Sequence, residues 1–411
     1  MTKDETAIIV GGSHAAAQLC QSLRLEGWLG RILVISDDTS LPYHRPPLSK
    51  EYLQGDKDAS GLLIRSQSAY DKLDVEFLLN IRVEAIDRQN RCIRLRNGNV
   101  VEYSKLALCT GARARKLSIP GATLSGVRYL RDLADAEAIK LDIRHNRKAV
   151  IVGGGYIGLE VAALLRKIGL EVCILETMSR VLQRVTSEEV SAFYTRIHTE
   201  EGVQIETNVS VTEIIGSGRV EAVICDNIEP IEAGLVIAGI GVVPNVELAL
   251  DCGLDIDNGI VVNEYAQTSD EHIFAAGDCT RHKNLIYEQD MRLESVPNAT
   301  EQSKIAAASM CGKLSPYNFL PWFWSNQYDL RLQIAGLNQG YDEVVIRGDI
   351  EHGRSFTAWY LKKGTIIAAD CMNRPKEFIL AKKLIQDKCK VPVAQLSDDS
   401  RDLEIPVARA D

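Results

Sequence analysis

Three glycines and one acidic residue are spaced as a dinucleotide-binding loop and give this chain its clearest chemical signal. Gly153, Gly155 and Gly158 follow a short apolar run, Ala149 to Val152, in the pattern G-x-G-x-x-G. The first glycine permits a tight turn, the second lets the backbone approach a pyrophosphate, and the third lets the next helix pack on the strand. Glu176 lies near the roughly 20-residue distance at which a carboxylate accepts hydrogen bonds from an adenosine ribose. Because that carboxylate would repel a 2′-phosphate, the loop favours NADH over NADPH.

The flanking sequence predicts the elements that this loop requires. A helix that Gly169 can end is indicated by apolar residues at helical spacing, namely Ile157, Val161, Leu164, Leu165 and Ile168. A strand from Leu170 to Leu175 follows it. The glycine pattern alone also fits a glycine-rich loop of any α/β protein. Strand, turn, helix, strand and acid together predict a dinucleotide site whose phosphates bind at the helix N-terminus.

A second copy of the motif opens the chain. A strand from Ala7 to Val10 precedes Gly11-Gly12-Ser13-His14-Ala15-Ala16 and a helix to about Leu25. The copy departs from the pattern, because Ser13 takes the place of the second glycine and Ala16 that of the third. Alanine is an accepted third residue. The serine hydroxyl is able to bond a phosphate oxygen, but its side chain narrows the approach of the backbone.

The strand after this second loop, Arg31 to Ile35, ends close to two acids. Asp37 is the preferred ribose ligand and Asp38 is the alternative. Each of them is also open to the plainer interpretation of a solvated turn acid.

Composition limits the classes of function. The chain has 411 residues, which predicts two or three domains, and its 45% hydrophobic and 25% charged residues are typical of a globular protein. No apolar run reaches the roughly 18 residues of a membrane span, and the first residues lack a signal peptide, so a cytoplasmic location is expected. The net charge of −9 argues against nucleic-acid binding. Ten cysteines without a C-x-x-C pair predict neither a disulfide framework nor a metal site.

Three further segments are weaker signals. The run LPYHRPPLSK, Leu41 to Lys50, predicts a rigid proline turn with Arg45 and Lys50 beside it. These cations are placed to contact a cofactor, or they are surface charges. Two apolar strands end in small residues, Leu106 to Thr110 before Gly111 and Ile273 to Asp278 in a glycine and an acid.

In this order, the segments resemble one family. The chain is similar to flavoproteins with two dinucleotide-binding domains, and among them to the NADH-dependent ferredoxin reductases of oxygenase systems, the putidaredoxin reductase type. The resemblance covers essentially the whole length. Its markers are VGGSHAA, LPYHRPPLSK, LCTGARAR, GGGYIGLE, AGIGVVPN, FAAGDC, ESVPNATEQ and PWFWSNQYDL.

The resemblance implies an α/β fold with two Rossmann-like domains and a small α+β C-terminal domain. The FAD domain would comprise residues 1–117 and 243–320, the NADH domain 118–242, and the C-terminal domain 321–411. Asp278 would bond the ribityl chain of FAD, and Gly241 would lie near the nicotinamide. The implied cofactor-binding residues are Gly11, Ser13, His14, Ala15, Ala16, Asp37, Arg45, Lys50, Thr110, Gly111, Arg131, Asp278, Val296, Trp324, Gly153, Gly155, Tyr156, Ile157, Gly158, Glu160, Glu176 and Gly241.

Lys50 and Glu160 would form the catalytic pair, since the corresponding residues are paired beside the flavin in related reductases. A fixed cation near the flavin N5 stabilises arriving electron density, and a carboxylate keeps that lysine charged. An ordinary helix glutamate is the alternative for Glu160. The helix predicted to start near Ser295 would stabilise negative charge at the flavin N1 and O2 edge, or Ser295 and Asn298 would serve only as caps.

The C-terminal part carries short strands at Leu330–Ala335, Glu343–Arg347, Ser355–Leu361 and Thr365–Ala369 and a helix at Lys376–Ile385. The resemblance assigns Trp324 to the flavin and the electron-transfer surface, although clustered aromatics are more often core residues. Asn326 replaces an aspartate common in the family. The tail, Ala394 to Asp411, is expected to have little order near its end.

The implied function is electron transfer from NADH through FAD to a [2Fe-2S] ferredoxin that feeds an oxygenase or cytochrome P450. Arg65, Arg292, Arg331, Arg354, Lys362 and Lys363 are candidates for a basic docking patch, or are solvated charges. A rubredoxin reductase is an alternative with nearly the same reductase half. A disulfide reductase is disfavoured because the RPPLSK turn has no cysteine. A flavin-stabilised signalling protein like apoptosis-inducing factor shares the fold, but should oxidise NADH slowly with every acceptor.

Overall fold

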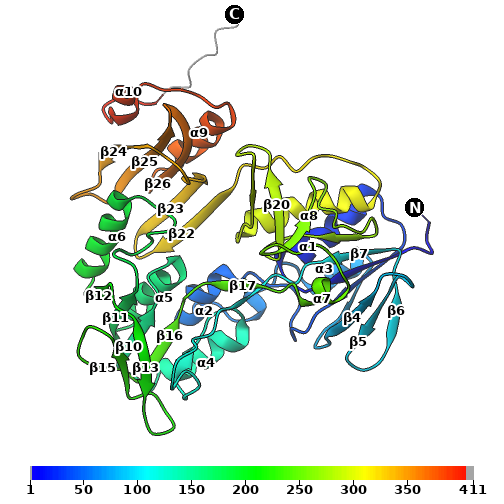
Figure 1. Ribbon diagram of the computed structural model, residues 1–411, viewed down its shortest axis with the longest axis horizontal. Helices are drawn as coiled ribbons and strands as arrows, with labels where there is room; N and C mark the ends of the chain where they lie inside the picture. The colour runs from blue at the N-terminus through cyan, green and yellow to red at the C-terminus, as the bar shows by residue number, and fades with distance from the viewer. Residues whose placement is uncertain (1, 404–411) are drawn as a thin grey trace, which may run out of the picture. The chain divides into compact units, whose positions relative to one another are not determined.

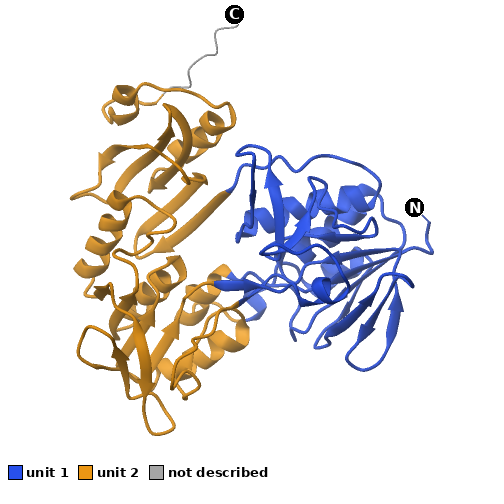
Figure 2. Ribbon diagram, viewed as in Figure 1, with its two compact units in different colours: residues 1–45, 59–113, 242–321 blue, residues 46–58, 114–241, 322–411 orange. Residues whose placement is uncertain are grey.

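The computed structural model describes residues 2–403. The chain divides into two compact units (Figure 2), and each is described by itself. Unit 1 comprises residues 1–45, 59–113 and 242–321, and unit 2 comprises residues 46–58, 114–241 and 322–411. The expected NADH and C-terminal domains both fall in unit 2, and so do residues 46–58, which were expected in the FAD domain. The division into FAD, NADH and C-terminal domains stays a prediction.

Unit 1 is built on a parallel sheet with the order β19–β7–β1–β2–β3. Its strands are β1 (Thr6–Val10), β2 (Arg31–Ile35), β3 (Val75–Leu78), β7 (Lys105–Leu108) and β19 (Ile273–Ala275). The central strands are nearly continuous runs of apolar residues because both faces of the sheet are covered. This accounts for the close agreement between predicted and observed strand limits.

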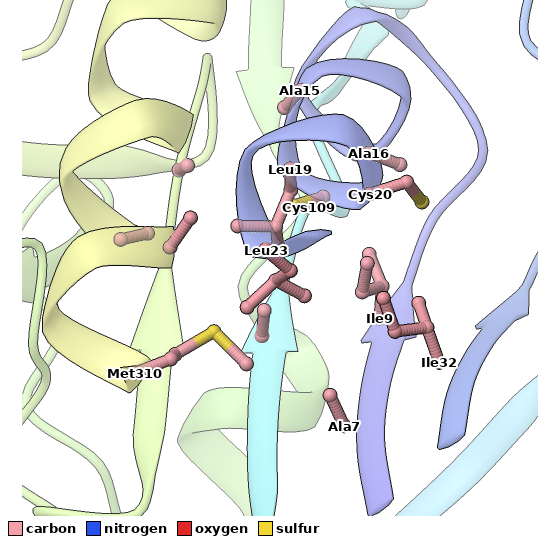
Figure 3. Close-up of a cluster of buried hydrophobic side chains, with 14 of the residues drawn as sticks. Ala7, Ile9, Ala15, Ala16, Leu19, Cys20, Leu23, Ile32, Cys109 and Met310 are labelled. Atoms are coloured by element: carbon pink, nitrogen blue, oxygen red, sulfur yellow. The ribbon is translucent and has the colours of Figure 1, made fainter. Parts of the chain in front are cut away.

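Two helices, α1 (His14–Glu26) and α8 (Val296–Met310), pack against each other in unit 1. Ile9 of the sheet, Leu19 and Leu23 of α1, and Met310 of α8 belong to one buried cluster (Figure 3). Gly27 ends α1 with φ +95°, a conformation that glycine adopts without strain. The packing aligns both helices so that their N-termini approach the carboxyl ends of the strands, as described below.

Smaller elements complete unit 1. An antiparallel sheet, β4–β5–β6, supplies Ile86, Ile93 and Leu95 to a second buried cluster with strands β1 and β7. The elements are η2 (Ser60–Leu62), α3 (Gln67–Lys72), β4 (Val83–Asp87), β5 (Cys92–Leu95), β6 (Val100–Glu102), β8 (Ala112–Ala114), at which the chain leaves the unit, β17 (Val242–Pro244), α7 (Glu247–Asp251), β18 (Ile260–Val262), β20 (Thr280–Asn284) and β21 (Gln289–Met291).

Unit 2 contains a second parallel sheet, with the order β12–β11–β10–β16–β9. Its elements are β9 (Val127–Arg128), α4 (Leu133–Ile143), β10 (Lys148–Val152), α5 (Tyr156–Lys167), β11 (Glu171–Glu176), α6 (Glu188–Glu200), β12 (Gln204–Thr207), the antiparallel β13 (Val211–Ile215), β14 (Ala222–Cys225) and β15 (Ile231–Glu232), and β16 (Leu235–Ala238). The predicted strand–turn–helix–strand order around the second glycine loop is therefore present.

The predicted buried face of α5 was partly wrong. Val161, Leu164 and Leu165 are buried, but Ile157 is 46% exposed and Ile168 is 37% exposed. Ile157 lies in the first turn, and Ile168 caps the helix after its last residue. At a helix end, a side chain has a helical turn on only one side of it, so less of its surface is covered.

The C-terminal part of unit 2 is an antiparallel sheet with the order β22–β23–β26–β25–β24 (Figure 1). Its elements are β22 (Trp322–Gln327), β23 (Leu330–Gly336), β24 (Glu343–Asp349), β25 (Ser355–Lys362), β26 (Thr365–Met372), α9 (Pro375–Gln386) and α10 (Val393–Ser397). Strand β22 was not predicted from the sequence. The tail is ordered through α10, where the buried Arg347 donates to backbone carbonyls including those of Leu396 and Asp398. The expectation of disorder at the chain end concerns residues 404–411, which lie outside the described range.

Residues 46–58 are held by unit 2 rather than by unit 1. They form η1 (Pro46–Ser49) and α2 (Glu51–Gln54). Tyr52 donates its hydroxyl to Glu137 at 2.5 Å, and the Lys140 ammonium lies 3.6 Å from the centre of the Tyr52 ring. Burial, together with the Glu137 carboxylate, raises the pKa of Tyr52 to about 12. These contacts fix the part of the RPPLSK turn that carries Lys50.

Candidate functional site

The first glycine loop joins β1 to α1 in unit 1. Gly11 has φ +109°, and a Cβ there would lie 2.2 Å from the backbone oxygen of Cys109. Its N–H donates to the carbonyl of Ile35 at 2.8 Å. Only glycine allows this close crossing of strand ends.

Ser13 links the first loop to the RPPLSK turn. It occupies the N-cap of α1 without capping the helix through its own hydroxyl. That hydroxyl instead accepts a hydrogen bond from Nε of Arg45 at 3.1 Å. The serine at the second glycine position therefore holds the Arg45 guanidinium at the N-terminus of α1. The guanidinium and the helix N-terminus each favour the binding of an anion. Among its neighbours, His14 is buried with its ring 5.5 Å from that of His44, and Ala15 and Ala16 are buried.

The two acids after β2 have different surroundings. Asp38 accepts a hydrogen bond from the Tyr43 hydroxyl at 3.0 Å and lies 3.9 Å from Nη2 of Arg45. Asp37 is exposed and has no hydrogen-bond or ionic partner among the described residues. Of the two acids, Asp37 is the one whose carboxylate is not engaged among the described residues, and its role as a ribose ligand stays a prediction.

Asp278 follows β19 where two helix N-termini converge. A Cβ on the preceding Gly277 would lie 3.5 Å from the Cβ atoms of Ala15 in α1 and Ala299 in α8. Ser295 caps α8 by accepting from the N–H of Asn298 at 3.2 Å, which supports the predicted cap. Asp278 is half-buried beside these helix ends, and Val296 is the first residue of α8.

Thr110 and Gly111 hold the crossing strands together. The Thr110 hydroxyl donates to the carbonyl of Asn245 at 2.6 Å, and the Asn245 side-chain amide donates to the Thr110 carbonyl at 2.8 Å. The Gly111 carbonyl accepts from the Asn245 N–H at 2.9 Å. The Thr110 hydroxyl therefore joins the segment after β7 to the backbone of Asn245.

The second glycine loop repeats the construction of the first. Gly153 has φ +108°, and a Cβ on it would lie 2.6 Å from the carbonyl oxygen of Gly239. A Cβ on Gly158 would lie 2.1 Å from the carbonyl oxygen of Gly153, so this glycine lets α5 pack on the strand. A Cβ on Gly155 would meet no atom within 4 Å. The open space beside Gly155, at the N-cap of α5, is where the motif requires room for a pyrophosphate.

Glu176 ends β11 and reaches back to the loop. Its carboxylate accepts hydrogen bonds from the N–H of Gly154 at 2.7 Å and of Met178 at 2.8 Å. These bonds fix the carboxylate beside the glycine loop, as the predicted contact with a ribose requires.

Three other residues of unit 2 are predicted to contact a nucleotide: Tyr156, Gly241 and Arg131. Tyr156 packs its ring 5.1 Å from that of Phe323, and its hydroxyl is buried without a hydrogen-bond partner among the described residues. Burial raises the pKa of Tyr156 well above its usual value. Gly241 has φ +96° with open space at its Cβ position, and Arg131 donates its backbone N–H to Asp135 at 2.9 Å.

The predicted pair of Lys50 and Glu160 is present within unit 2. The Lys50 ammonium lies 3.0 Å from Oε1 of Glu160, and the two side chains are 16% and 7% exposed. Ser49 donates to Oε2 of Glu160 at 2.7 Å, and Ser325 donates to Oε1 at 2.7 Å. The buried carboxylate is thus balanced by one cation and two hydroxyl donors. Ser49 and Ser325 were missed from the sequence.

Strand β22 explains the role of Ser325. Alternate residues of a strand face opposite sides, and β22 directs Phe323, Ser325 and Gln327 toward α5 and α6, where their partners are Tyr156, Glu160 and His198. The other face lines an open depression of about 730 Å³, bordered by Trp322, Trp324, Asn326, Asp329, Arg331, Gln333, Asn373 and Pro375. The two-residue period of β22 would have revealed both faces had the strand been recognised.

Three of the six candidate residues for a basic docking patch are engaged by other residues, and three are exposed. Arg292 is largely buried and ion-paired with Glu294, and Arg354 is ion-paired with Asp329, Glu200 and Glu201. Arg65 is bonded to Gln21 and to the carbonyl of Ala17. Exposed cations remain at Arg331, Lys362 and Lys363.

The sequence profile of the pyridine nucleotide-disulphide oxidoreductase family matches residues 5–303, and that of the reductase C-terminal family matches residues 322–405. The chain belongs to the pyridine nucleotide-disulphide oxidoreductase family. It is 42% identical to putidaredoxin reductase of Pseudomonas putida over 100% of this chain and 98% of that protein. It is 35% identical to a rubredoxin-NAD(+) reductase of the same species over 90% of this chain and 96% of that protein.

Solved structures agree with this assignment. The reductase in a covalent putidaredoxin reductase–putidaredoxin complex superposes with a TM-score of 0.94 at 42% identity, covering 97% of each chain. The α/β architecture with two Rossmann-like sheets and a C-terminal domain is therefore confirmed. Oxidoreductases of this family use FAD and NAD(H). Among residues 2–403, no helix has the length and apolar character needed to cross a membrane.

The residues of unit 1 fit the anionic dinucleotide that this family uses. The N-termini of α1 and α8 both approach Asp278, Arg45 is held by Ser13, and Asp37 is exposed two residues after β2. In unit 2, the open position at Gly155 and the fixed carboxylate of Glu176 fit a second dinucleotide.

Replacing Gly11 with alanine should abolish FAD binding. The new Cβ would be forced against the Cys109 carbonyl in a left-handed backbone conformation. We expect G11A to retain less than roughly a tenth of the FAD of the wild type, because one helix N-terminus of the site would be displaced. The measurement is the ratio of flavin to protein absorbance after purification.

G27A is the matched control. Gly27 also has positive φ, but a Cβ there meets nothing within 4 Å, so it carries the backbone strain without the clash. The control should keep its FAD. A G11A protein with full FAD would contradict the assignment of this loop.

Proposed function

We propose that the chain transfers electrons from NADH, through bound FAD, to a small [2Fe-2S] ferredoxin that supplies an oxygenase or cytochrome P450. The observation that carries the proposal is the buried Lys50–Glu160 pair in a chain that also has two dinucleotide loops, one with the full G-x-G-x-x-G pattern and one with Ser13 and Ala16 in place of the second and third glycines. Similarity to putidaredoxin reductase over the whole length supports it.

Unit 1 holds FAD in this proposal. Gly11 and Ser13 contact the pyrophosphate at the N-terminus of α1, and Arg45 adds a positive charge there. Asp37 accepts from the adenosine ribose, and Asp278 accepts from the ribityl chain. When bound, FAD supplies the step that joins the two-electron chemistry of NADH to the one-electron chemistry of an iron–sulfur protein.

Unit 2 holds NADH. Gly153, Gly155 and Gly158 receive its pyrophosphate at the N-terminus of α5, and Glu176 accepts hydrogen bonds from its ribose. The negative charge of Glu176 excludes a 2′-phosphate. Tyr156, Ile157 and Gly241 surround the nicotinamide end.

Lys50 would provide a positive charge beside the bound flavin, and Glu160 holds the Lys50 ammonium in one orientation through their ion pair. A preorganised charge of this kind contributes most where water is excluded. The pair requires no side-chain nucleophile or general base. The same assignment makes Trp324 a contact of the flavin and the electron-transfer surface.

The protein acceptor binds the open face of β22. Trp322 and Trp324 give this depression aromatic walls, Arg331 gives it an exposed cation, and the Lys382 ammonium lies 5.8 Å from the centre of the Trp322 ring. Aromatic residues and arginine are enriched where proteins form complexes. An acidic ferredoxin complements these charges. A cytoplasmic location is proposed because all ten cysteines are free thiols.

Two other functions remain as alternatives. A rubredoxin is a second candidate acceptor because rubredoxin-NAD(+) reductases are among the relatives. A signalling flavoprotein would oxidise NADH slowly with every acceptor. A disulfide reductase is disfavoured, because residues 46–58 contain no cysteine.

A panel of acceptors separates these functions. The holoenzyme is mixed with NADH and, in turn, with several purified [2Fe-2S] ferredoxins and a rubredoxin, and reduction of each is followed by absorbance. We expect one ferredoxin to be reduced at least roughly tenfold faster than rubredoxin, with a rate that falls as salt is added. Faster reduction of rubredoxin, or equally slow reduction of every protein, would reject the proposed acceptor.

Glu176 should set the coenzyme preference. Replacing it with glutamine keeps a hydrogen-bond acceptor for the glycine loop but removes the charge that excludes a 2′-phosphate. We expect E176Q to lower the NADH-to-NADPH ratio of kcat/KM by roughly tenfold, and E176A by at least as much. Steady-state rates with both coenzymes measure the ratio, and an unchanged ratio in both variants would contradict the assignment.

A further inference from the structure

A row of buried hydrogen bonds begins at Oε1 of Glu160, the same carboxylate oxygen that the Lys50 ammonium contacts. Ser325 donates to Oε1 of Glu160 at 2.7 Å. The Gln327 side-chain amide donates to the Ser325 hydroxyl oxygen at 3.2 Å. Both residues lie on the face of β22 that packs on α5, and both are buried.

The row then crosses to α6. His198 is fully buried, with Nε2 2.8 Å from Oε1 of Gln327 and Nδ1 3.1 Å from the hydroxyl of Tyr328. Burial lowers the pKa of His198 to about 4, so its imidazole is neutral at neutral pH. A neutral imidazole has one N–H donor and one acceptor nitrogen.

Only one direction of donation satisfies every group in the row. Ser325 has a single proton, and the Glu160 carboxylate requires it as a donor. Ser325 must then accept from the Gln327 N–H, which turns the Gln327 carbonyl toward His198. His198 is consequently protonated at Nε2 and accepts from Tyr328 at Nδ1. Reversing Gln327 would leave its carbonyl and Glu160 in competition for one serine proton.

We propose that Ser325, Gln327 and His198 are positioning residues that orient the Glu160 carboxylate and strengthen its pairing with Lys50. Each group donates toward the carboxylate, and hydrogen bonds aligned in one direction polarise one another in a low-dielectric interior. The row fixes Oε1, while Ser49 fixes Oε2 from the other side. Lys50 therefore approaches a carboxylate that has one orientation.

The same bonds would also form if these groups were only satisfying their buried polarity. Two features favour a function. The row ends on the carboxylate of the one charged pair assigned to the reaction, and its members come from α6 and β22, two elements far apart in the sequence. The inference rests on the proposed function of Lys50 and Glu160, and its test must separate the two.

The test uses S325A, S325T and E160Q in the holoenzyme, together with the double variant S325A/E160Q. Anaerobic stopped-flow mixing with NADH gives the limiting rate constant of flavin reduction and the dissociation constant of NADH. We expect S325A to lower the rate constant roughly tenfold without changing NADH affinity, and S325T to restore it by keeping the hydroxyl. In the E160Q background, S325A should have no further effect.

The outcomes separate the two claims. If E160Q is slow and S325A matches the wild type, the positioning role is wrong and the charged pair stands. If E160Q is also as fast as the wild type, the function of the pair itself fails. If the two substitutions act additively, Ser325 does not work through Glu160 and the inference is overturned.

A spectroscopic measurement does not depend on turnover or on a folded S325A variant. Wild-type holoenzyme labelled with ¹⁵N-histidine, with His198 assigned by comparison with H198Q, reports the tautomer of this imidazole. We expect a neutral ring protonated at Nε2 at pH 7. A ring protonated at Nδ1, or at both nitrogens, would reverse or break the row and reject the proposal.

Discussion

The buried carboxylate of Glu160 is the constraint on which much of unit 2 depends. A charge that is 7% exposed is stable only when its surroundings supply opposite charge and donors. Here they come from two stretches of chain far from α5 in the sequence: Ser49 and Lys50 in residues 46–58, and Ser325 on β22. Removing one partner of such a pair costs about 3–5 kcal/mol. The contacts that stabilise the buried Glu160 carboxylate are therefore the same contacts that hold these segments together and position Lys50.

The FAD site proposed for unit 1 has the opposite requirement, a place for anionic phosphates in a chain of net charge −9. It concentrates positive potential locally, through the N-termini of α1 and α8 and through Arg45, rather than through a basic surface. The RPPLSK turn carries Arg45 in unit 1 and Lys50 in unit 2. One short turn thus supplies a cation to each unit.

The features predicted from the sequence are those encoded by neighbouring residues. Both glycine loops, the apolar parallel strands and the cap at Ser295 depend on local pattern, and they were found within a few residues. Strand β22 was missed because one of its faces contacts α5 and the other carries half-buried tryptophans, so apolar and polar residues do not alternate. The surroundings of Glu160 were missed because Ser325 meets it across 165 positions. Ile157 and Ile168 show the limit of periodicity at helix ends, and no local signal marked Arg354 as fully ion-paired.

The most direct test of the account is the rate at which NADH reduces the flavin when Lys50 loses its charge. K50Q keeps donors for Glu160 but removes the cation, and K167Q, which alters an exposed lysine of α5, is the matched control. Anaerobic stopped-flow mixing should show K50Q reduced roughly 10- to 100-fold more slowly than the wild type, with bound FAD and NADH affinity retained. K167Q should match the wild type. A K50Q enzyme that is reduced as fast as the wild type would contradict the central claim that this pair governs electron arrival.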